Sequence, residues 1–256
     1  MQAGAKRCWY MLCGLIAQQA DALTPISVRL HDSLTISTYE SVGGSYGRQT
    51  WPASVAAACW IVDGGAEAQL RNCRMVEVGS GTGLCSLALA SCGASVLATD
   101  VDKEALSIVG IAAKACGHSS LIRTEFFDVL DRSSALPMGD VMVAADVMYS
   151  ASLARGLARR CAEALSMGMR VLVADPGRPT RRDFDAELAI VGAELNLDAS
   201  LRSCTFREAA DIGSFSEWVC GTSGDRLLGL DLPPSQASEC RRRITRHAQV
   251  ADSTLL

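Results

Sequence analysis

The chain has 256 residues, of which 49% are hydrophobic and 20% are charged, and its net charge is −4. This composition is typical of a globular protein with a sizeable buried core and excludes a disordered chain. The acidic balance argues against a general nucleic-acid-binding protein, which needs a basic surface, so we expect no nucleic-acid partner.

The first 34 residues are predicted to be an N-terminal extension. Lys6 and Arg7 precede an apolar stretch over residues 8–17 that is too short to span a membrane, and no apolar run reaches about 18 residues. The stretch resembles a weak mitochondrial or secretory leader, but a plain N-terminal helix is the favoured interpretation. We therefore expect a monomeric, cytoplasmic protein without a membrane partner, with mitochondria as the alternative location.

From residue 35 the pattern indicates one α/β domain that ends near residue 225, followed by a C-terminal tail over residues 226–256. Residues 35–39 alternate as in a strand or hairpin arm, residues 41–47 form a Gly/Ser turn, and Pro52 opens a helix over residues 51–62. Strands and helices then alternate, as in a parallel α/β sheet. The predicted strands are residues 74–78, 95–99, 121–127, 140–145, 170–174, 194–205 and 216–220. The predicted helices are residues 83–91, 103–115, 153–166 and 181–191, the last of which ends near Gly192.

The eleven cysteines do not form a metal-binding pattern. They are scattered without a CxxC pair, and His31, His118 and His247 lie far apart in the sequence. We therefore expect no metal site. Most of the cysteines lie in apolar stretches and their number is odd, which favours a reducing compartment.

A glycine-rich loop follows the first strand of the parallel sheet. It contains Gly79, Ser80, Gly81 and Gly83, and the acid Glu77 precedes it. Glycines let the backbone turn tightly and approach a ligand closely, and the loop opens a helix. Dinucleotide enzymes use the spacing GxGxxG, whereas the third glycine here comes one residue earlier. The loop therefore predicts a nucleoside-type cofactor and disfavours a dehydrogenase.

Two further acids follow the next two strands. A carboxylate at Asp100 can accept hydrogen bonds from both hydroxyls of a ribose. Helix capping is the alternative role, but Asp102 is the better candidate for the N-cap of the helix over residues 103–115. Phe127 and Asp128 can contact an adenine ring and its amino group, or else form core and surface positions. All these sites lie at the carboxyl ends of successive strands, where open α/β sheets bind ligands.

Polar residues also follow the fourth and fifth strands. Asp146 and Tyr149 place a carboxylate and a phenol after the fourth strand, although a helix cap with a packed tyrosine is the simpler reading. The turn Asp175-Pro176-Gly177-Arg178-Pro179 displays an acid and an arginine at the same edge of the sheet, unless it is only a stiff turn.

Together these residues resemble the family 16 seven-strand protein methyltransferases, most of which methylate lysine. The resemblance covers roughly residues 35–225 and is carried by Trp51-Pro52-Ala53, residues 77–83, Asp100 and above all Asp146 with Tyr149. The turn over residues 175–179 resembles a narrower branch, the lysine methyltransferases of the electron-transfer-flavoprotein β-subunit. The resemblance implies a class I methyltransferase fold, a Rossmann-like and mostly parallel seven-stranded sheet flanked by helices.

The resemblance also implies S-adenosyl-L-methionine as the cofactor and a role for each matching residue. Trp51 would cover the cofactor near its adenosine end. Gly79 and Gly81 would form the floor, and Glu77, Ser80 and Gly83 would also be cofactor-binding residues. Asp100 would hold the ribose, Phe127 and Asp128 would bracket the adenine, and Ala145 would line the methyl end. Asp146 and Tyr149 would be catalytic: Asp146 would attract and orient a lysine ammonium, and Tyr149 would hydrogen-bond the amine.

The leading hypothesis is therefore a protein-lysine N-methyltransferase. A small-molecule N-methyltransferase is the second hypothesis and predicts a closed, apolar acceptor pocket. A catalytically inactive scaffold subunit is the third, and the intact glycine loop together with Asp100 argues against it.

Overall fold

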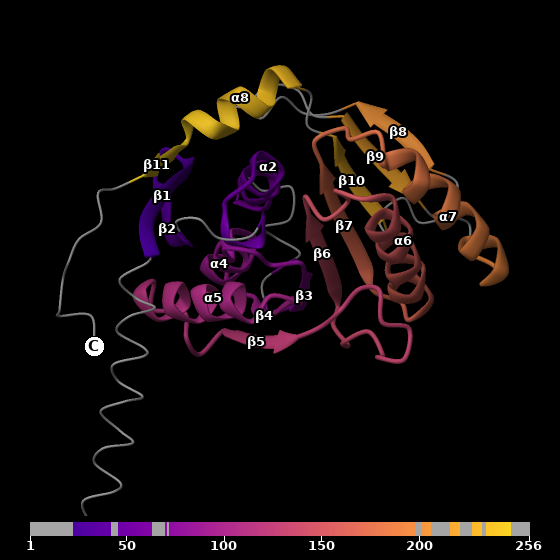
Figure 1. Ribbon diagram of the computed structural model, residues 1–256, viewed down its shortest axis with the longest axis horizontal. Helices are drawn as coiled ribbons and strands as arrows, with labels where there is room; N and C mark the ends of the chain where they lie inside the picture. Colours follow the sequence, from indigo (N-terminus) through magenta and orange to yellow (C-terminus); the bar gives the residue numbers. More distant parts are fainter. Residues whose placement is uncertain are drawn as a thin grey trace, which may run out of the picture.

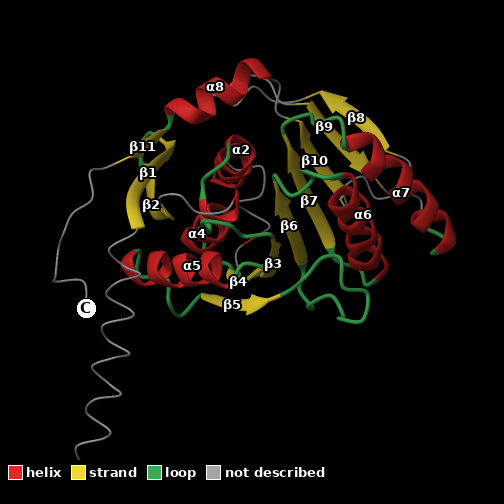
Figure 2. Ribbon diagram, in the orientation of Figure 1, coloured by secondary structure: helices red, strands yellow, loops and turns green. Residues whose placement is uncertain are grey.

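The computed structural model describes residues 23–41, 46–62, 70, 72–197, 201–205, 216–220, 227–231 and 234–246. These residues form a large sheet with helices on both faces and a small sheet beside it (Figures 1 and 2). In this part of the chain, no helix is both long and apolar enough to cross a bilayer. The helix predicted at the N-terminus lies outside the described residues.

The large sheet has the strand order β5-β4-β3-β6-β7-β10-β9-β8. Its strands are β3 (Arg74–Val78), β4 (Ser95–Asp100), β5 (Ile122–Phe126), β6 (Val141–Ala145), β7 (Arg170–Asp175), β8 (Leu201–Thr205), β9 (Ser216–Cys220) and β10 (Leu227–Asp231). Neighbouring strands from β5 to β10 are parallel, and β9 pairs antiparallel with both β10 and β8. The strand order reverses between β3 and β6, which is where open α/β sheets bind ligands.

The predicted α/β fold of the class I methyltransferases is confirmed, with one strand more than the seven expected. The additional strand is β10, which pairs with β7 and lies in the region predicted as the C-terminal tail. Its sequence, Leu-Leu-Gly-Leu-Asp, is a short apolar run, and its central glycine weakens the strand signal.

Helices cover both faces of the large sheet (Figure 2). On one face lie α2 (Pro52–Trp60), α4 (Leu84–Ser91) and α5 (Lys103–Ala115), and on the other lie α6 (Ala151–Ser166) and α7 (Arg181–Glu194). The strand β6 is buried on both faces, as its continuous apolar sequence predicts. Val141 and Val143 pack into the core beneath the first group of helices, and Met142 and Ala144 pack into the core beneath the second.

The prediction for residues 192–197 is wrong in part. The helix α7 runs through Gly192 to Glu194 instead of ending at the glycine, and residues 195–197, predicted as part of a strand, are not in one. The helix is terminated by Asn196, whose φ of 53° lies in the left-handed region, and the Leu197 N–H donates to the Gly192 carbonyl at 2.8 Å. Asparagine is the common substitute for glycine at this position of a helix end, which explains why the glycine signal misplaced it.

The small sheet joins the two ends of the described chain. It consists of β1 (Leu23–His31), β2 (Leu34–Ser41) and β11 (Ile244–Arg246), all antiparallel, and α8 (Pro234–Arg242) leads into β11. The hairpin arm predicted over residues 35–39 is therefore confirmed as part of β2. Arg243, which lies in the region predicted as the C-terminal tail, is buried and donates to the Leu30 carbonyl at 3.0 Å.

Candidate active site

A pocket opens at the carboxyl ends of β3, β4, β5 and β6, at the point where the strand order reverses. Every residue that the sequence predicts for the site, with the exception of Gly83, lines this pocket. These residues are Trp51, Glu77, Gly79, Ser80, Gly81, Asp100, Phe127, Asp128, Ala145, Asp146 and Tyr149.

Two glycines of the loop after β3 are required for different reasons. Gly79 has a φ of 70°, and a Cβ atom added to it would lie 2.8 Å from Cγ2 of Val147, so the conformation and the space both require glycine. Gly83, with a φ of 76°, begins α4, and a Cβ atom there would lie 2.9 Å from Cγ2 of Val109 in α5. Gly83 therefore allows α4 and α5 to pack closely, and it does not line the pocket.

Glu77 supports the loop from below. Its carboxyl group accepts a hydrogen bond from the Ser86 hydroxyl in α4, and the residue is buried. Burial raises the pKa of Glu77 to about 7, and the contacts with Ser86 only partly oppose this effect. Glu77 thus connects the end of β3 to the start of α4, beneath the loop.

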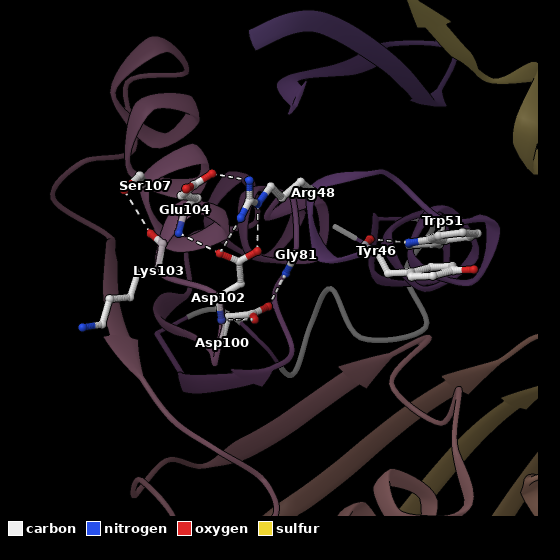
Figure 3. Close-up of polar contacts among 9 residues, drawn as sticks. All are labelled: Tyr46, Arg48, Trp51, Gly81, Asp100, Asp102, Lys103, Glu104 and Ser107. Carbon is white, nitrogen blue, oxygen red and sulfur yellow. Dashed lines mark hydrogen bonds and ion pairs between the residues drawn. The ribbon is translucent and has the colours of Figure 1, made fainter. Parts of the chain in front are cut away.

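Asp100 links the glycine loop to the next helix (Figure 3). Its Oδ2 accepts from the Gly81 N–H at 2.9 Å, and its Oδ1 accepts from the Asp102 N–H at 2.9 Å. Burial raises the pKa of Asp100, and these backbone donors lower it again. Asp102 is the N-cap of α5, as predicted, and accepts from the Glu104 N–H at 2.9 Å. Since each carboxylate oxygen has two lone pairs, Asp100 retains acceptor capacity for ribose hydroxyls.

Phe127 and Asp128 form the wall of the pocket after β5. Phe127 is buried, and the guanidinium of Arg160 lies 5.0 Å from its ring centroid. Asp128 is partly exposed, and its Oδ1 accepts from the Leu130 N–H at 2.8 Å. An apolar ring beside an exposed carboxylate is the arrangement predicted for an adenine site.

Three aromatic rings lie at the mouth of the pocket. Tyr46, in the short 3-10 helix η1 (Tyr46–Arg48), stacks on Trp51 with the ring centroids 5.4 Å apart and on Tyr149 with the centroids 6.2 Å apart. The Trp51 Nε1 also donates to the Tyr46 carbonyl at 2.8 Å (Figure 3). Tyr46 and Tyr149 are both exposed to solvent.

Asp146 lies at the opposite end of the pocket from Asp128, directly after β6. Its φ of 62° lies in the left-handed region, and its N–H donates to the Ala174 carbonyl at 2.9 Å. One carboxylate oxygen, Oδ1, forms an ion pair with Arg178, and the backbone N–H of Ala53 also interacts with the carboxylate. The other oxygen, Oδ2, is buried and has no hydrogen bond of ordinary geometry in the described structure. Burial raises the pKa of Asp146 to about 6 despite the nearby charge of Arg178.

The turn after β7 places Arg178 against Asp146. Asp175, the first residue of this turn, accepts from the N–H groups of Gly177 and Arg178 at 2.8 and 2.9 Å. Asp175 is fully buried, and this burial raises its pKa. Its negative charge further raises the pKa of Asp146. The turn therefore fixes Arg178 between two buried carboxyl groups.

The chemistry of the pocket fits S-adenosylmethionine. The space above Gly79 and Gly81 is open to a ligand, and the buried Ser80 hydroxyl has no hydrogen-bond partner in the described chain. Asp100 has free acceptor capacity, Phe127 presents an apolar ring, and Asp128 presents a partly exposed carboxylate. The charged groups that line the pocket are four acids and a single arginine, Arg178, which suits a cationic sulfonium. The fold and the site together define a class I S-adenosylmethionine-dependent methyltransferase.

Comparison of the sequence with known families gives the more specific assignment. Residues 30–185 match methyltransferase family 16, described as lysine methyltransferase, and the chain belongs to this family. No curated protein sequence matches the chain.

Solved structures similar to this chain include methyltransferases of low sequence identity. The ribosomal protein L11 methylase from Lactobacillus delbrueckii subsp. bulgaricus is 18% identical, with a TM-score of 0.47 over 71% of this chain and 92% of that chain. Magnesium protoporphyrin IX methyltransferase from Synechocystis PCC 6803 with bound SAH is 13% identical, with a TM-score of 0.44 over 61% of this chain and 78% of that chain. The same enzyme with bound SAM is 16% identical, with a TM-score of 0.42 over 60% of this chain and 71% of that chain.

Sequence reasoning left eleven of the 22 described pocket-lining residues unassigned, among them Tyr46, Gly47, Gln49 and Arg178. Tyr46, Gly47 and Gln49 belong to a segment in which only a Gly/Ser turn was visible. Arg178 was recognised as part of a rigid turn, but its pairing with Asp146 joins positions 32 residues apart and has no local sequence signal.

Proposed function

We propose that this methyltransferase transfers its methyl group to the side-chain nitrogen of lysine in a protein substrate. The observation that carries the proposal is Asp146, which lines the pocket and whose buried Oδ2 has no hydrogen bond of ordinary geometry in the described structure. A buried carboxylate oxygen without a donor is energetically costly, and an ammonium group would supply the missing donor. The family match to the lysine methyltransferases supports the same acceptor.

The cofactor roles follow from the pocket lining. We assign the floor to Gly79, Ser80 and Gly81, the ribose to Asp100, and the adenine to Phe127 and Asp128. Trp51 would cover the adenosine end, and Ala145 would line the methyl end. When bound, S-adenosylmethionine supplies an electrophilic methyl group on a positively charged sulfur.

The acceptor must lose a proton before it can react. A lysine side chain has a pKa near 10.4, so its neutral form at pH 7 costs about 4.6 kcal/mol. Asp146 would bind and orient the ammonium through Oδ2, and would pass the released proton on to solvent. Tyr149 would form one wall of the lysine channel and hydrogen-bond the amine, and the exposed ring of Tyr46 would contact the aliphatic part of the side chain.

Incubation with S-adenosylmethionine labelled in its methyl group and a protein lysate tests this proposal. We expect label in protein bands, and methyl-lysine as the labelled product after complete hydrolysis. Label confined to small molecules would favour a small-molecule N-methyltransferase instead. Absence of transfer, together with absence of cofactor binding in calorimetry, would favour a scaffold subunit.

A narrower substrate follows from the resemblance of the turn over residues 175–179. We propose the β-subunit of electron-transfer flavoprotein as the first acceptor to assay, with lysine-to-arginine variants of that subunit as controls. We also propose that the enzyme is a monomer of the cytoplasm or mitochondria. Light scattering after size-exclusion chromatography tests the first part, and cell fractionation tests the second.

A further inference from the structure

Residues 46–51 form a segment that covers one side of the pocket, hereafter the covering segment. Tyr46, Gly47, Gln49 and Trp51 all line the pocket. The segment approaches the glycine loop so closely that a Cβ atom on Gly81 would lie 3.1 Å from the Gly47 carbonyl oxygen. The contacts of the covering segment therefore determine the shape of the cofactor site.

The C-terminal end of the covering segment is fixed by buried hydrogen bonds. The Thr50 hydroxyl lies 2.9 Å from the Thr82 hydroxyl in the glycine loop, and the Thr50 N–H donates to Glu40 of β2 at 2.9 Å. Glu40 is in turn paired with Arg246 of β11, with 2.8 Å between Nε and Oε2. This end is held by several elements at once.

The N-terminal end of the covering segment is held by Arg48 (Figure 3). The Arg48 Nε lies 2.8 Å from Asp102 Oδ2, its Nη2 lies 3.5 Å from Asp102 Oδ1, and its Nη1 forms an ion pair with Glu104. The side chains of Arg48 and Asp102 are 21% and 19% exposed. A planar guanidinium that contacts two carboxylates in a partly buried position is held more firmly than a typical surface pair.

The partner of Arg48 is also connected to the cofactor site. The Asp102 N–H donates to Asp100 Oδ1, and Asp100 Oδ2 accepts from the Gly81 N–H. Arg48 therefore joins the covering segment to the same short stretch of chain that positions the proposed ribose-binding carboxylate and the glycine loop.

We propose that Arg48 is a positioning residue that fastens the covering segment over the cofactor and thereby sets how long the cofactor and its product stay bound. Cofactor exchange then requires the Arg48 ion pairs to separate. Because ions screen these pairs, exchange is faster at high salt. The inference rests on the cofactor and is independent of whether lysine is the acceptor.

The test measures the dissociation rate of S-adenosylhomocysteine from the full-length chain by stopped flow, and its affinity by calorimetry. Arg48→Met keeps the aliphatic stem and removes the charge. We expect dissociation about three- to tenfold faster than in the wild type, the size of one partly buried ion pair. Arg48→Lys keeps the charge without the planar fork, and we expect an intermediate rate.

Two further variants separate positioning from a general loss of stability. Glu104→Gln removes the more exposed partner and leaves the Asp102 cap intact, so we expect a smaller acceleration. The double variant of Arg48→Met and Glu104→Gln should dissociate no faster than Arg48→Met alone. Arg74→Met removes an exposed ion pair to Asp140 at the opposite end of β3, and it should leave dissociation unchanged.

Salt dependence is the readout that a purely structural role does not change. We expect the wild-type dissociation rate to rise with sodium chloride concentration and the rate of Arg48→Met to stay nearly flat. If Arg48→Met keeps the wild-type rate with the wild-type salt dependence, Arg48 does not fasten the covering segment. Should Arg48→Met fail to fold, an unchanged rate and salt dependence in Glu104→Gln would overturn the proposal equally.

Discussion

The two ends of the pocket differ in how their carboxyl groups are satisfied. At the cofactor end, both oxygens of Asp100 accept hydrogen bonds from backbone N–H groups. At the proposed acceptor end, hereafter the acceptor end, Asp146 and Asp175 each have one buried oxygen without a hydrogen bond of ordinary geometry in the described structure. Burial raises the pKa of all three groups, but only at the acceptor end does it leave carboxylate oxygens unpaired.

This difference indicates that the carboxylate hydrogen bonds of the cofactor end are formed before any ligand binds, whereas those of the acceptor end are formed only in part. The cofactor end is built from backbone conformation. Among its described residues, the unpaired buried polar atom is the neutral Ser80 hydroxyl, which costs less to bury than a charge. The acceptor end concentrates two buried acids around one arginine, and one of the acids lies in a left-handed backbone conformation. Such strained groups commonly lie at functional sites, where a ligand supplies the missing interactions.

We expect the largest effect on methyl transfer from Asp146→Asn, which removes the negative charge of Asp146 at the acceptor end. Asparagine adopts the left-handed conformation readily, so the backbone should be preserved. The loss of the negative charge should lower the turnover of methyl transfer about 100-fold or more, in the range typical of an acid–base group. We expect the affinity for S-adenosylhomocysteine to stay within about twofold, because the cofactor end is untouched.

The matched control for this variant is Asp140→Asn, which makes the same change in an exposed ion pair at the other end of the sheet. It should retain wild-type turnover. If Asp146→Asn kept both its turnover and its affinity for the acceptor, Asp146 would have no role in the reaction.

Glu77→Gln tests the cofactor end of the pocket, where Glu77 is a buried acid. Its pKa is raised from an ordinary value of 4.5 to about 7, so the folded protein binds a proton that the unfolded chain releases. The free energy of unfolding should therefore fall as the pH rises from 4.5 to 7. The glutamine variant should lack this component, which amounts to roughly 3 kcal/mol at about 1.36 kcal/mol per unit.

Urea unfolding of both proteins across this pH range measures the difference between them. The two proteins should diverge as the pH rises, with the variant becoming the more stable. Parallel curves would show that Glu77 ionises as it does in the unfolded chain, and that the cofactor end contains no strained acid.

The elements that position the cofactor end could be predicted from the sequence because the residues that indicate them lie close together in the chain. Residues 103–115 are a helix with the predicted boundaries, since Asp102 caps its start and Gly117, with a φ of 75°, follows its end. The glycine loop and Asp100 likewise carry their chemistry within a few residues of a strand end. For α5, a strand end, a cap and a helix stop follow one another in the sequence, and prediction and structure agree.

The remaining features depend on contacts between distant positions. Arg243 is buried because it reaches Leu30, which is 213 residues away, and β10 is a strand because β7 is available to pair with it. The ion pair of Arg178 with Asp146 spans 32 residues. A polar or weakly apolar segment in a single sequence does not indicate which distant partner will bury it.

Gly79→Ala is expected to weaken cofactor binding without changing the acceptor end of the pocket. Both the φ of 70° and the distance of 2.8 Å to Val147 oppose a side chain here, so we expect the dissociation constant for S-adenosylhomocysteine to rise about 10- to 30-fold. Turnover at saturating cofactor should remain near that of the wild type. Gly93→Ala is the control, because Gly93 has a φ of 87° with open space around it. It should lose stability without losing affinity, and an equal loss of affinity in both variants would contradict the role of Gly79.

We expect the smallest effect from Arg178→Gln, which removes a positive charge beside Asp146 and keeps the Asp146 carboxylate. The pKa of Asp146 is raised to about 6 by burial, and the positive charge of Arg178 opposes this rise, whereas Asp175 adds to it. Removal of the charge should therefore raise the pKa of Asp146 further. Since the carboxylate is the active form in the proposed reaction, the acid limb of the pH–rate profile should move to higher pH.

The expected loss for Arg178→Gln is about two- to fivefold at pH 7, and it should disappear at more alkaline pH as Asp146 ionises again. Arg155→Gln, which breaks an ion pair with Asp183 between α6 and α7, should leave the profile in place. A loss that is the same at every pH would mean that Arg178 contacts the acceptor directly rather than through Asp146. The pH dependence therefore decides whether the arginine belongs to the electrostatics of the acceptor end or to its binding surface.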